Sequence, residues 1–209
     1  MVFRLNDDMV FPPTELAEPD GLLAVGGDLS IERLKLAYQS GIFPWYSHDT
    51  PILWYAPHER FVLFPDELRV SKSMQKTLKQ GLFEVTRNKA FADVISACSQ
   101  ITRPGQDGTW ITGDMKAAYL KLHKEGLAQS VEVWQNNELV GGAYGVEVGN
   151  VFCGESMFSK VSNASKVALI TLCQTQEYKL IDCQVHTEHL ESMGARMIGR
   201  DEYMEILAG

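Results

Sequence analysis

The stretch GNVFCGESMFSKVSNASKVALITLCQTQEYKLIDCQV, residues 149–185, sets the architecture expected for the whole chain. It opens with a Gly149-Asn150 turn and an apolar run that predicts a strand over residues 151–153. The next apolar segment recurs at helical spacing over a wide arc, which predicts a buried helix with Ser162 or Asn163 as its N-cap. A second strand is predicted over residues 180–185. The stretch therefore reads as a strand–helix–strand unit.

Three polar residues stand out at the strands of this unit. Side chains alternate along a strand, so Asp182 and Gln184 are expected to share one face. A carboxylate and an amide in an otherwise apolar strand need partners, because unpaired polar groups are costly to bury. Glu155 is expected where the first strand ends, and the unit can bring it beside them at the centre of a sheet. These three residues are the predicted reacting centre. The alternative is that they are purely structural, in which case Glu155 ties the strand to the helix.

Composition places the chain among ordinary globular proteins. It has 209 residues, of which 45% are apolar and 22% charged, enough for one domain with a small appendage. No apolar run approaches the roughly 20 residues that span a bilayer, and no signal-peptide core is seen at the N-terminus. The four cysteines form no CxxC pair, which predicts reduced thiols. A cytoplasmic protein without a membrane partner is expected.

Neither a metal nor binding through overall charge is expected. Cys183, His186 and His189 lie three residues apart, a spacing that does not keep all three on one face, and no fourth ligand is evident. The net charge is −8, which disfavours nucleic-acid binding by bulk charge but leaves room for a local basic patch.

One such patch follows the start of the main domain. Lys72, Lys76 and Lys79 are spaced four and three apart, so on a helix they share a face with each other, and Arg69 lies just before them. Phosphate binding and an ordinary solvated face are both possible interpretations.

The N-terminal part has a different composition. Residues 1–62 are rich in Pro, Gly and aromatics and predict a small N-terminal domain, which leaves residues 63–209 for the larger one. The segment GIFPWYSHDTPILWYAPHERFVLFP holds four prolines and seven aromatic residues. Its rings predict either a rigid binding platform or a small core.

The remainder of the sequence predicts an α+β protein. Apolar spacing indicates helices around Leu34–Tyr38, Phe91–Cys98 and Met115–Leu122. Strands over 130–134, 139–146 and 151–153, joined by turns, predict an antiparallel meander. A Gly-rich loop is expected over residues 102–112. Helices covering a mixed sheet follow from this order.

Common catalytic and nucleotide-binding motifs are absent from the sequence, which contains no GxSxG, GxxxxGK[ST] or GxGxxG. The order of elements resembles acyl-CoA-dependent N-acetyltransferases. Where those enzymes carry a Gly-rich pyrophosphate loop, this chain reads SKVSNASK, without glycine. A backbone cradle for a diphosphate is therefore missing, and no cofactor is expected.

Seven motifs occur in order across residues 15–205: GLLAVGGDLS, GIFPWYS, GTWIT, ELVGGAYGV, FCGESMFS, NASK and LIDCQV. With them the chain resembles the leucyl/phenylalanyl-tRNA–protein transferases of bacteria. The resemblance implies an acetyltransferase-like (GNAT-like) larger domain. It also implies transfer of Leu, Phe or Met from aminoacyl-tRNA to the N-terminal Arg or Lys of a protein, which marks that protein for degradation by the N-degron pathway. A monomer is expected.

The resemblance also assigns residues. Trp45 and Trp110 match the rings that hold the terminal adenosine. The basic patch of Arg69, Lys72, Lys76 and Lys79, found from its spacing and not from the resemblance, is expected to contact tRNA phosphates. The aminoacyl side-chain pocket matches Ala143, Phe152, Met157, Leu169, Leu172 and Ile181. Among these, Ala143 and Leu172 are smaller than the residues expected there.

The chemistry needs alignment more than a strong base. An α-amine has an ordinary pKa of about 7.7–8.0, so a useful fraction is neutral near pH 7. The Gln184 carbonyl is expected to accept a hydrogen bond from this amine, while Asp182 accepts from the Gln184 NH2 and stabilises developing positive charge. An acyl-CoA-dependent N-acyltransferase and a non-catalytic RNA-binding module are the alternatives.

Overall fold

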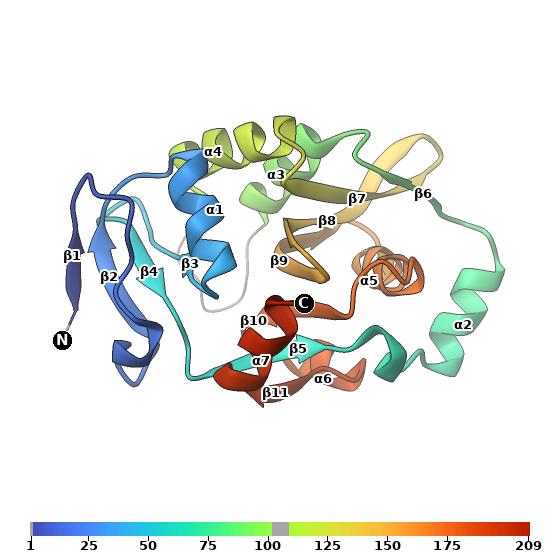
Figure 1. Ribbon diagram of the computed structural model, residues 1–209. Helices are drawn as coiled ribbons and strands as arrows, with labels where there is room; N and C mark the ends of the chain where they lie inside the picture. Colours follow the sequence, from blue (N-terminus) through green and yellow to red (C-terminus); the bar gives the residue numbers. More distant parts are fainter. Residues whose placement is uncertain (1, 102–108) are drawn as a thin grey trace.

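The computed structural model describes residues 2–101 and 109–209, and Figure 1 shows two sheets of different size. The smaller sheet lies at the N-terminal end and, in the described residues, has the strand order β1-β2-β4-β3. Its elements are β1 (Phe3–Leu5), β2 (Leu22–Gly26), β3 (Phe43–Pro44) and β4 (Leu53–Tyr55), with a 3-10 turn, η1 (Thr14–Leu16), before β2. Helix α1 (Ile31–Gln39) begins where the Ser30 side chain accepts a hydrogen bond from the Arg33 backbone N–H.

The larger sheet carries the rest of the chain. Within the described residues it has seven strands in the order β11-β5-β10-β9-β8-β7-β6. They are β5 (Glu59–Leu63), β6 (Glu84–Arg87), β7 (Ala128–Gln135), β8 (Glu138–Val148), β9 (Val151–Ser159), β10 (Leu180–Gln184) and β11 (Arg196–Gly199). Strands β9 and β10 are parallel, and the neighbouring pairs β10–β5 and β8–β9 are antiparallel, so the sheet is mixed.

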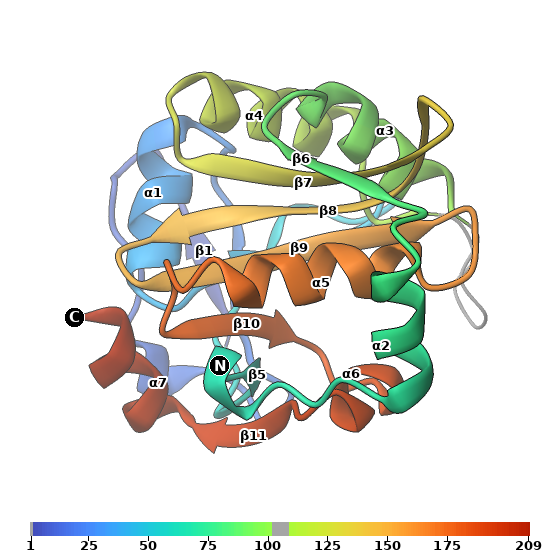
Figure 2. The ribbon, with the colours of Figure 1, turned by 90° about the vertical axis from the view of Figure 1, so that its right-hand side faces the viewer.

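Helices cover both faces of this sheet (Figures 1 and 2). Helices α3 (Phe91–Gln100) and α4 (Gly113–Lys124) contribute to one apolar core, and α5 (Ala164–Gln174) contributes to the other. The remaining helical elements are η2 (Pro65–Glu67), α2 (Lys72–Lys79), α6 (Glu188–Ser192) and α7 (Arg200–Leu207). The predicted α+β class, with a mixed sheet flanked by helices, is confirmed.

The predicted strand–helix–strand unit is β9–α5–β10, and the predicted meander is β7–β8–β9. One detail of the prediction was wrong: β9 does not end near Glu155 but continues to Ser159. It keeps pairing with β8 through a register shift between Tyr144 and Gly145. A Cβ on Gly145 would come within 2.7 Å of the Phe152 ring, so only glycine allows this close approach. Glu155 therefore lies inside a paired strand.

Several short elements were not predicted from the sequence, because short segments carry little periodicity. These are the strands of the smaller sheet together with β5, β6, β11, α6 and α7. The domain boundary expected between residues 62 and 63 falls within β5, which pairs with β10 and β11. That division stays a prediction. The Gly-rich loop expected over 102–112 lies, from residue 102 to 108, outside the described residues.

No helix among the described residues is both long and apolar enough to cross a membrane.

Candidate active site

An apolar pocket of about 410 Å³ opens beside the end of β10. All six residues predicted for the aminoacyl pocket line it: Ala143, Phe152, Met157, Leu169, Leu172 and Ile181. They come from β8, β9, α5 and β10, so the strand–helix–strand unit builds most of the wall. Trp45 and Trp110, from segments that the sequence separates widely, line the same pocket. The predicted reacting residues Glu155, Asp182 and Gln184 line it as well.

Strand pairing explains why these three lie together. Parallel pairing of β9 with β10 sets Cys153 beside Asp182, and Glu155 lies two residues further along β9. A Cβ on Gly154, between them, would lie 3.1 Å from the Asp182 carbonyl oxygen, so the two strands run unusually close here. The polar residues therefore gather at the point where β10 leaves its neighbours.

Glu155 is buried and held by two tyrosines and Gln184. The Tyr38 hydroxyl donates to Glu155 Oε1 over 2.7 Å, and the Tyr119 hydroxyl donates to Oε2 over 2.9 Å. The Gln184 side-chain amide donates to Oε1 over 2.8 Å, and the two tyrosine hydroxyls contact each other. Burial, reinforced by the charge of Asp182, raises the pKa of Glu155 to about 7, although the three hydrogen bonds act in the opposite direction.

Asp182 is fully buried and paired with Arg60 from β5. Its Oδ2 accepts from the Arg60 guanidinium and, over 2.9 Å, from the Tyr203 hydroxyl of α7. Its Oδ1 accepts from the backbone N–H of Gln184 over 2.9 Å. Asp182 was expected to accept from the Gln184 NH2; this expectation was wrong, because that amide bonds to Glu155. The negative charge of Asp182 is paired with the buried Arg60. Its expected stabilisation of charge on an attacking amine stays a prediction.

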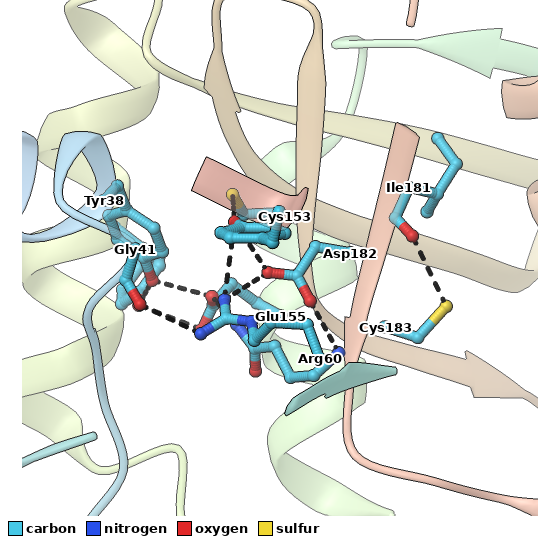
Figure 3. Close-up of polar contacts among 11 residues, drawn as sticks. Tyr38, Gly41, Arg60, Cys153, Glu155, Ile181, Asp182 and Cys183 are labelled. Atoms are coloured by element: carbon cyan, nitrogen blue, oxygen red, sulfur yellow. Dashed lines mark hydrogen bonds and ion pairs between the residues drawn. The ribbon is translucent and has the colours of Figure 1, made fainter. Parts of the chain in front are cut away.

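Arg60 lies in a closely fitting site. Its Nη1 donates to the Gly41 carbonyl oxygen over 2.9 Å, and Figure 3 shows the guanidinium between that carbonyl and Asp182. The guanidinium carbon lies 4.8 Å from the ring centroid of Phe43 and 4.5 Å from that of Tyr203. Burial alone would lower the pKa of Arg60, but the charge of Asp182 holds it above its ordinary value. Arg60 therefore keeps its charge and joins the N-terminal sheet to β10.

Four members of this centre were not predicted from the sequence: Arg60, Tyr203, Tyr38 and Tyr119. Tyr38 and Tyr119 were recognised only as members of apolar helix faces. Their hydroxyls were the available signal, because a buried tyrosine normally finds a hydrogen-bond partner.

The basic residues do not join the pocket. Arg69, Lys72, Lys76 and Lys79 are exposed on and just before α2, where Met74 is the buried anchor. Figure 1 shows α2 at the end of the molecule opposite the N-terminal sheet, from which Trp45 follows β3.

Comparisons with known proteins agree on one family. A model described as "Leucyl/phenylalanyl-tRNA protein transferase" matches residues 62–208, and a model of the N-terminal domain of the same transferase matches residues 27–58. Proteins named leucyl/phenylalanyl-tRNA–protein transferase are similar along almost the whole chain. That of Flavobacterium johnsoniae is 59% identical and covers 99% of each chain. That of Syntrophobacter fumaroxidans is 55% identical, covering 99% of this chain and 90% of the relative.

Solved structures resemble the chain only distantly. L-PGS from Bacillus licheniformis is 12% identical with a TM-score of 0.41, covering 81% of this chain and 57% of that chain. A GCN5-related N-acetyltransferase from Kribbella flavida is 10% identical with a TM-score of 0.38, covering 78% of this chain and 61% of that chain. This chain thus spans less than two thirds of the length of either.

An α+β fold with a pocket of this kind, matched along its length by transferases, defines an aminoacyltransferase. The chain belongs to the leucyl/phenylalanyl-tRNA–protein transferase family.

Proposed function

We propose that this protein transfers Leu, Phe or Met from aminoacyl-tRNA to the α-amine of an N-terminal Arg or Lys. It acts as a monomer in the cytoplasm, and the new N-terminal residue marks the acceptor for degradation by the N-degron pathway. The observation that carries the proposal is the joint lining of one pocket: apolar walls, two tryptophans and the Glu155–Gln184 pair. Such a pocket suits an aminoacyl ester whose side chain is apolar and whose ribose carries an adenine.

Gln184 aligns the attacking amine. Its amide nitrogen is committed to Glu155, which leaves the carbonyl oxygen as the acceptor for an amine proton. The amine then attacks the ester carbonyl, and the ribose oxygen leaves with a proton. Asp182 and Arg60 act indirectly, by holding the Gln184 backbone from behind.

Trp45 and Trp110 hold the terminal adenosine. Trp45 is 37% exposed, so a ring face is accessible to a base. Stacking of a base on an aromatic side chain contributes about 1–3 kcal/mol and tolerates any base. The lysines of α2 would contact backbone phosphates further along the tRNA.

The acceptor needs a site for a cation. Thr187 and Leu190 line the pocket at the start of α6, and their neighbours Glu188 and Glu191 are exposed acidic residues in its first turn. Acidic residues beside the pocket-lining Thr187 and Leu190 favour an acceptor that carries an α-amine and an Arg or Lys side chain.

An acyl-CoA-dependent N-acyltransferase is the competing function. Its donor would need free backbone N–H groups at the start of α5. There, the Ser165 N–H already donates to Ser159 Oγ over 3.2 Å, and the left-handed Asn163 precedes the helix. The occupied N–H disfavours a diphosphate; CoA binding detected by calorimetry would favour it.

One incubation tests the proposal. The protein is mixed with radiolabelled Leu-tRNA and a peptide that begins with Arg, and label in the peptide is measured. The same peptide with an acetylated N-terminus is the matched control, because it lacks the nucleophilic amine. Label in the free peptide alone is expected. An absence of label in both peptides would contradict the proposal and favour a non-catalytic RNA-binding module.

A further inference from the structure

The buried contacts among Tyr38, Tyr119 and Glu155 form a closed ring. Tyr38 contacts Glu155 Oε1, Tyr119 contacts Oε2, and the two hydroxyls are in close contact with each other. The three side chains come from α1, β9 and α4, and each is buried. The ring thus joins α1, in the N-terminal part of the chain, to α4 and to β9 of the large sheet.

A count of protons limits the ionisation state of this ring. Each of the three oxygen–oxygen contacts needs one proton, and each tyrosine hydroxyl supplies one. If Glu155 were ionised, both tyrosines would donate to it, and their mutual contact would bring lone pairs together without a proton. A neutral Glu155 supplies the third proton and satisfies every contact.

The position of that proton follows from the fourth contact. Glu155 Oε1 already accepts from the Gln184 amide over 2.8 Å as well as from Tyr38. Oε2 contacts only Tyr119 among these partners. The arrangement that satisfies all groups has Oε2 donating to Tyr119, Tyr119 donating to Tyr38, and Tyr38 donating to Oε1. The acid form thus reverses the bond between Tyr119 and Oε2, in which the hydroxyl donates when Glu155 is a carboxylate.

We propose that Tyr38, Tyr119 and Glu155 share three protons in this ring, so that Glu155 is a carboxylic acid in the resting site and, once ionised, takes a proton from the incoming α-ammonium. Tyr38 and Tyr119 are positioning residues. As two separate donors they lower the pKa of Glu155, but their contact with each other leaves the ring short of one proton, which the acid form of Glu155 supplies. The chemical role of Glu155 rests on the proposed function, whereas the ring itself does not.

The proton transfers balance. The Glu155 carboxylate takes one proton from the acceptor's ammonium, which leaves a neutral amine and a carboxylic acid. The amine nitrogen then forms a bond to the ester carbonyl carbon, the bond from that carbon to the ribose oxygen breaks, and one amine proton moves to this oxygen. Glu155 returns its proton to solvent. The pKa of Glu155, about 7, lies within about one unit of that of an α-amine, so the first transfer is nearly balanced.

The charged and titratable groups around Glu155 agree with this assignment. Asp182 on β10 adds a negative charge that favours the acid form, and the counter-charge of Arg60 is paired with Asp182. Burial raises the pKa of both Tyr38 and Tyr119 well above the ordinary value, and an ionised Glu155 raises it further, so both tyrosines stay protonated in either state of Glu155. Tyr144 of β8 packs its ring edge-on against Tyr119.

Infrared spectroscopy tests the ring without tRNA. The full-length protein, with its glutamates labelled with carbon-13, is titrated from about pH 5 to about pH 9 while the band of a buried protonated carboxyl is followed. We expect a band that disappears with a midpoint near pH 7 and is missing in Glu155→Gln. A Glu155 that stays ionised over this range, shown by no such band, overturns the proposal.

Tyr38→Phe and Tyr119→Phe test the role of the tyrosines. Either change removes the contact between hydroxyls and with it the need for a third proton, so the midpoint is expected to fall by about one pH unit. Loss of a plain hydrogen-bond donor to a carboxylate would raise the midpoint instead, and a raised or unchanged midpoint overturns the ring. Tyr178→Phe, which removes a hydroxyl that contacts Arg87, is the control and leaves the midpoint in place.

Discussion

Asp182 holds Gln184 by its backbone, not by its side chain. Asp182 Oδ1 accepts the Gln184 backbone N–H over 2.9 Å, while the Gln184 amide turns to Glu155. Gln184 has a φ of 59°, in the left-handed region, which costs a residue with a Cβ about 1–2 kcal/mol. The β10–β5 pairing also shifts register between Asp182 and Gln184. A strained residue held by a buried ion pair is expected where a side chain must be aimed accurately.

Gln184→Ala tests whether transfer needs the Gln184 side-chain amide. The change keeps a Cβ at the same left-handed position but removes the amide, so we expect single-turnover transfer at saturating aminoacyl-tRNA to fall by about 100-fold or more. Affinity for tRNA should stay within about twofold, because the amide contacts neither phosphates nor base in the proposed function. Gln174→Ala, at an exposed position of α5, is the control. An unchanged rate would make Gln184 a structural residue.

Arg60→Met tests the support behind Asp182. It leaves a buried carboxylate without its counter-charge, which should cost about 3–5 kcal/mol of unfolding free energy. Adding Asp182→Asn removes the orphaned charge and should restore part of this loss. Urea unfolding of the two single variants and the double variant gives the coupling energy. Additive losses would show that the ion pair does not act as a unit.

Much of this fold was predictable because its signals are local. Turn residues and apolar spacing predicted β9, α5 and β10, and helical spacing predicted α1, α3 and α4 on the correct faces. The sequence also predicted that Asp182 is buried and has polar partners, because an acidic residue in an apolar strand needs them. The pocket residues came from resemblance, and the structure gathers all of them in one pocket.

The partners of the centre could not be predicted in the same way. Arg60 and Asp182 are 122 residues apart, and Tyr38 and Glu155 are 117 apart. Nothing local in the sequence pairs them. Arg60 meets Asp182 only because β5 pairs with β10 in the large sheet, and Tyr38 meets Glu155 only because α1 packs against β9. The left-handed Gln184 was also unpredictable, since that conformation is usually marked by Gly or Asn. These contacts decide which group holds the Gln184 amide.

The raised pKa of Glu155 makes stability depend on pH. Its ordinary value is 4.5 and its value in the folded protein about 7. Between these values the folded state keeps a proton that the unfolded state has lost, so stability falls as pH rises and levels off above about 7. The difference in unfolding free energy between the wild type and Glu155→Gln should fall by about 3 kcal/mol over this window. Urea unfolding at several pH values measures it, and a difference independent of pH would contradict the raised pKa.

The lysines of α2 should control the salt dependence of tRNA binding. Lys72→Ala with Lys76→Ala removes two proposed phosphate contacts, so the slope of log affinity against log salt should become shallower by about 1.4–1.8. Lys35→Ala with Lys124→Ala removes two exposed lysines outside α2 and serves as the control. Equal slopes in the two double variants would identify the α2 stripe as a solvated face.

Pocket size should set the preferred amino acid. Ala143 is nearly buried in the pocket wall and pairs with Met157 across β8 and β9. Ala143 and Leu172 are smaller than the residues that the family resemblance leads us to expect. The proposed pocket is therefore deep: a bound Leu side chain leaves a void in it, whereas an aromatic ring fits. Unfilled space forfeits contacts with the bound side chain. We therefore expect a preference for Phe over Leu of at most about 1–2 kcal/mol in transition-state terms.

Ala143→Met should reverse this preference by refilling the pocket wall, whereas Ala117→Met, on the exposed face of α4, should not. The measurement is kcat/KM for Phe-tRNA against Leu-tRNA, and the same ratio in wild type and Ala143→Met would show that Ala143 does not shape the aminoacyl pocket.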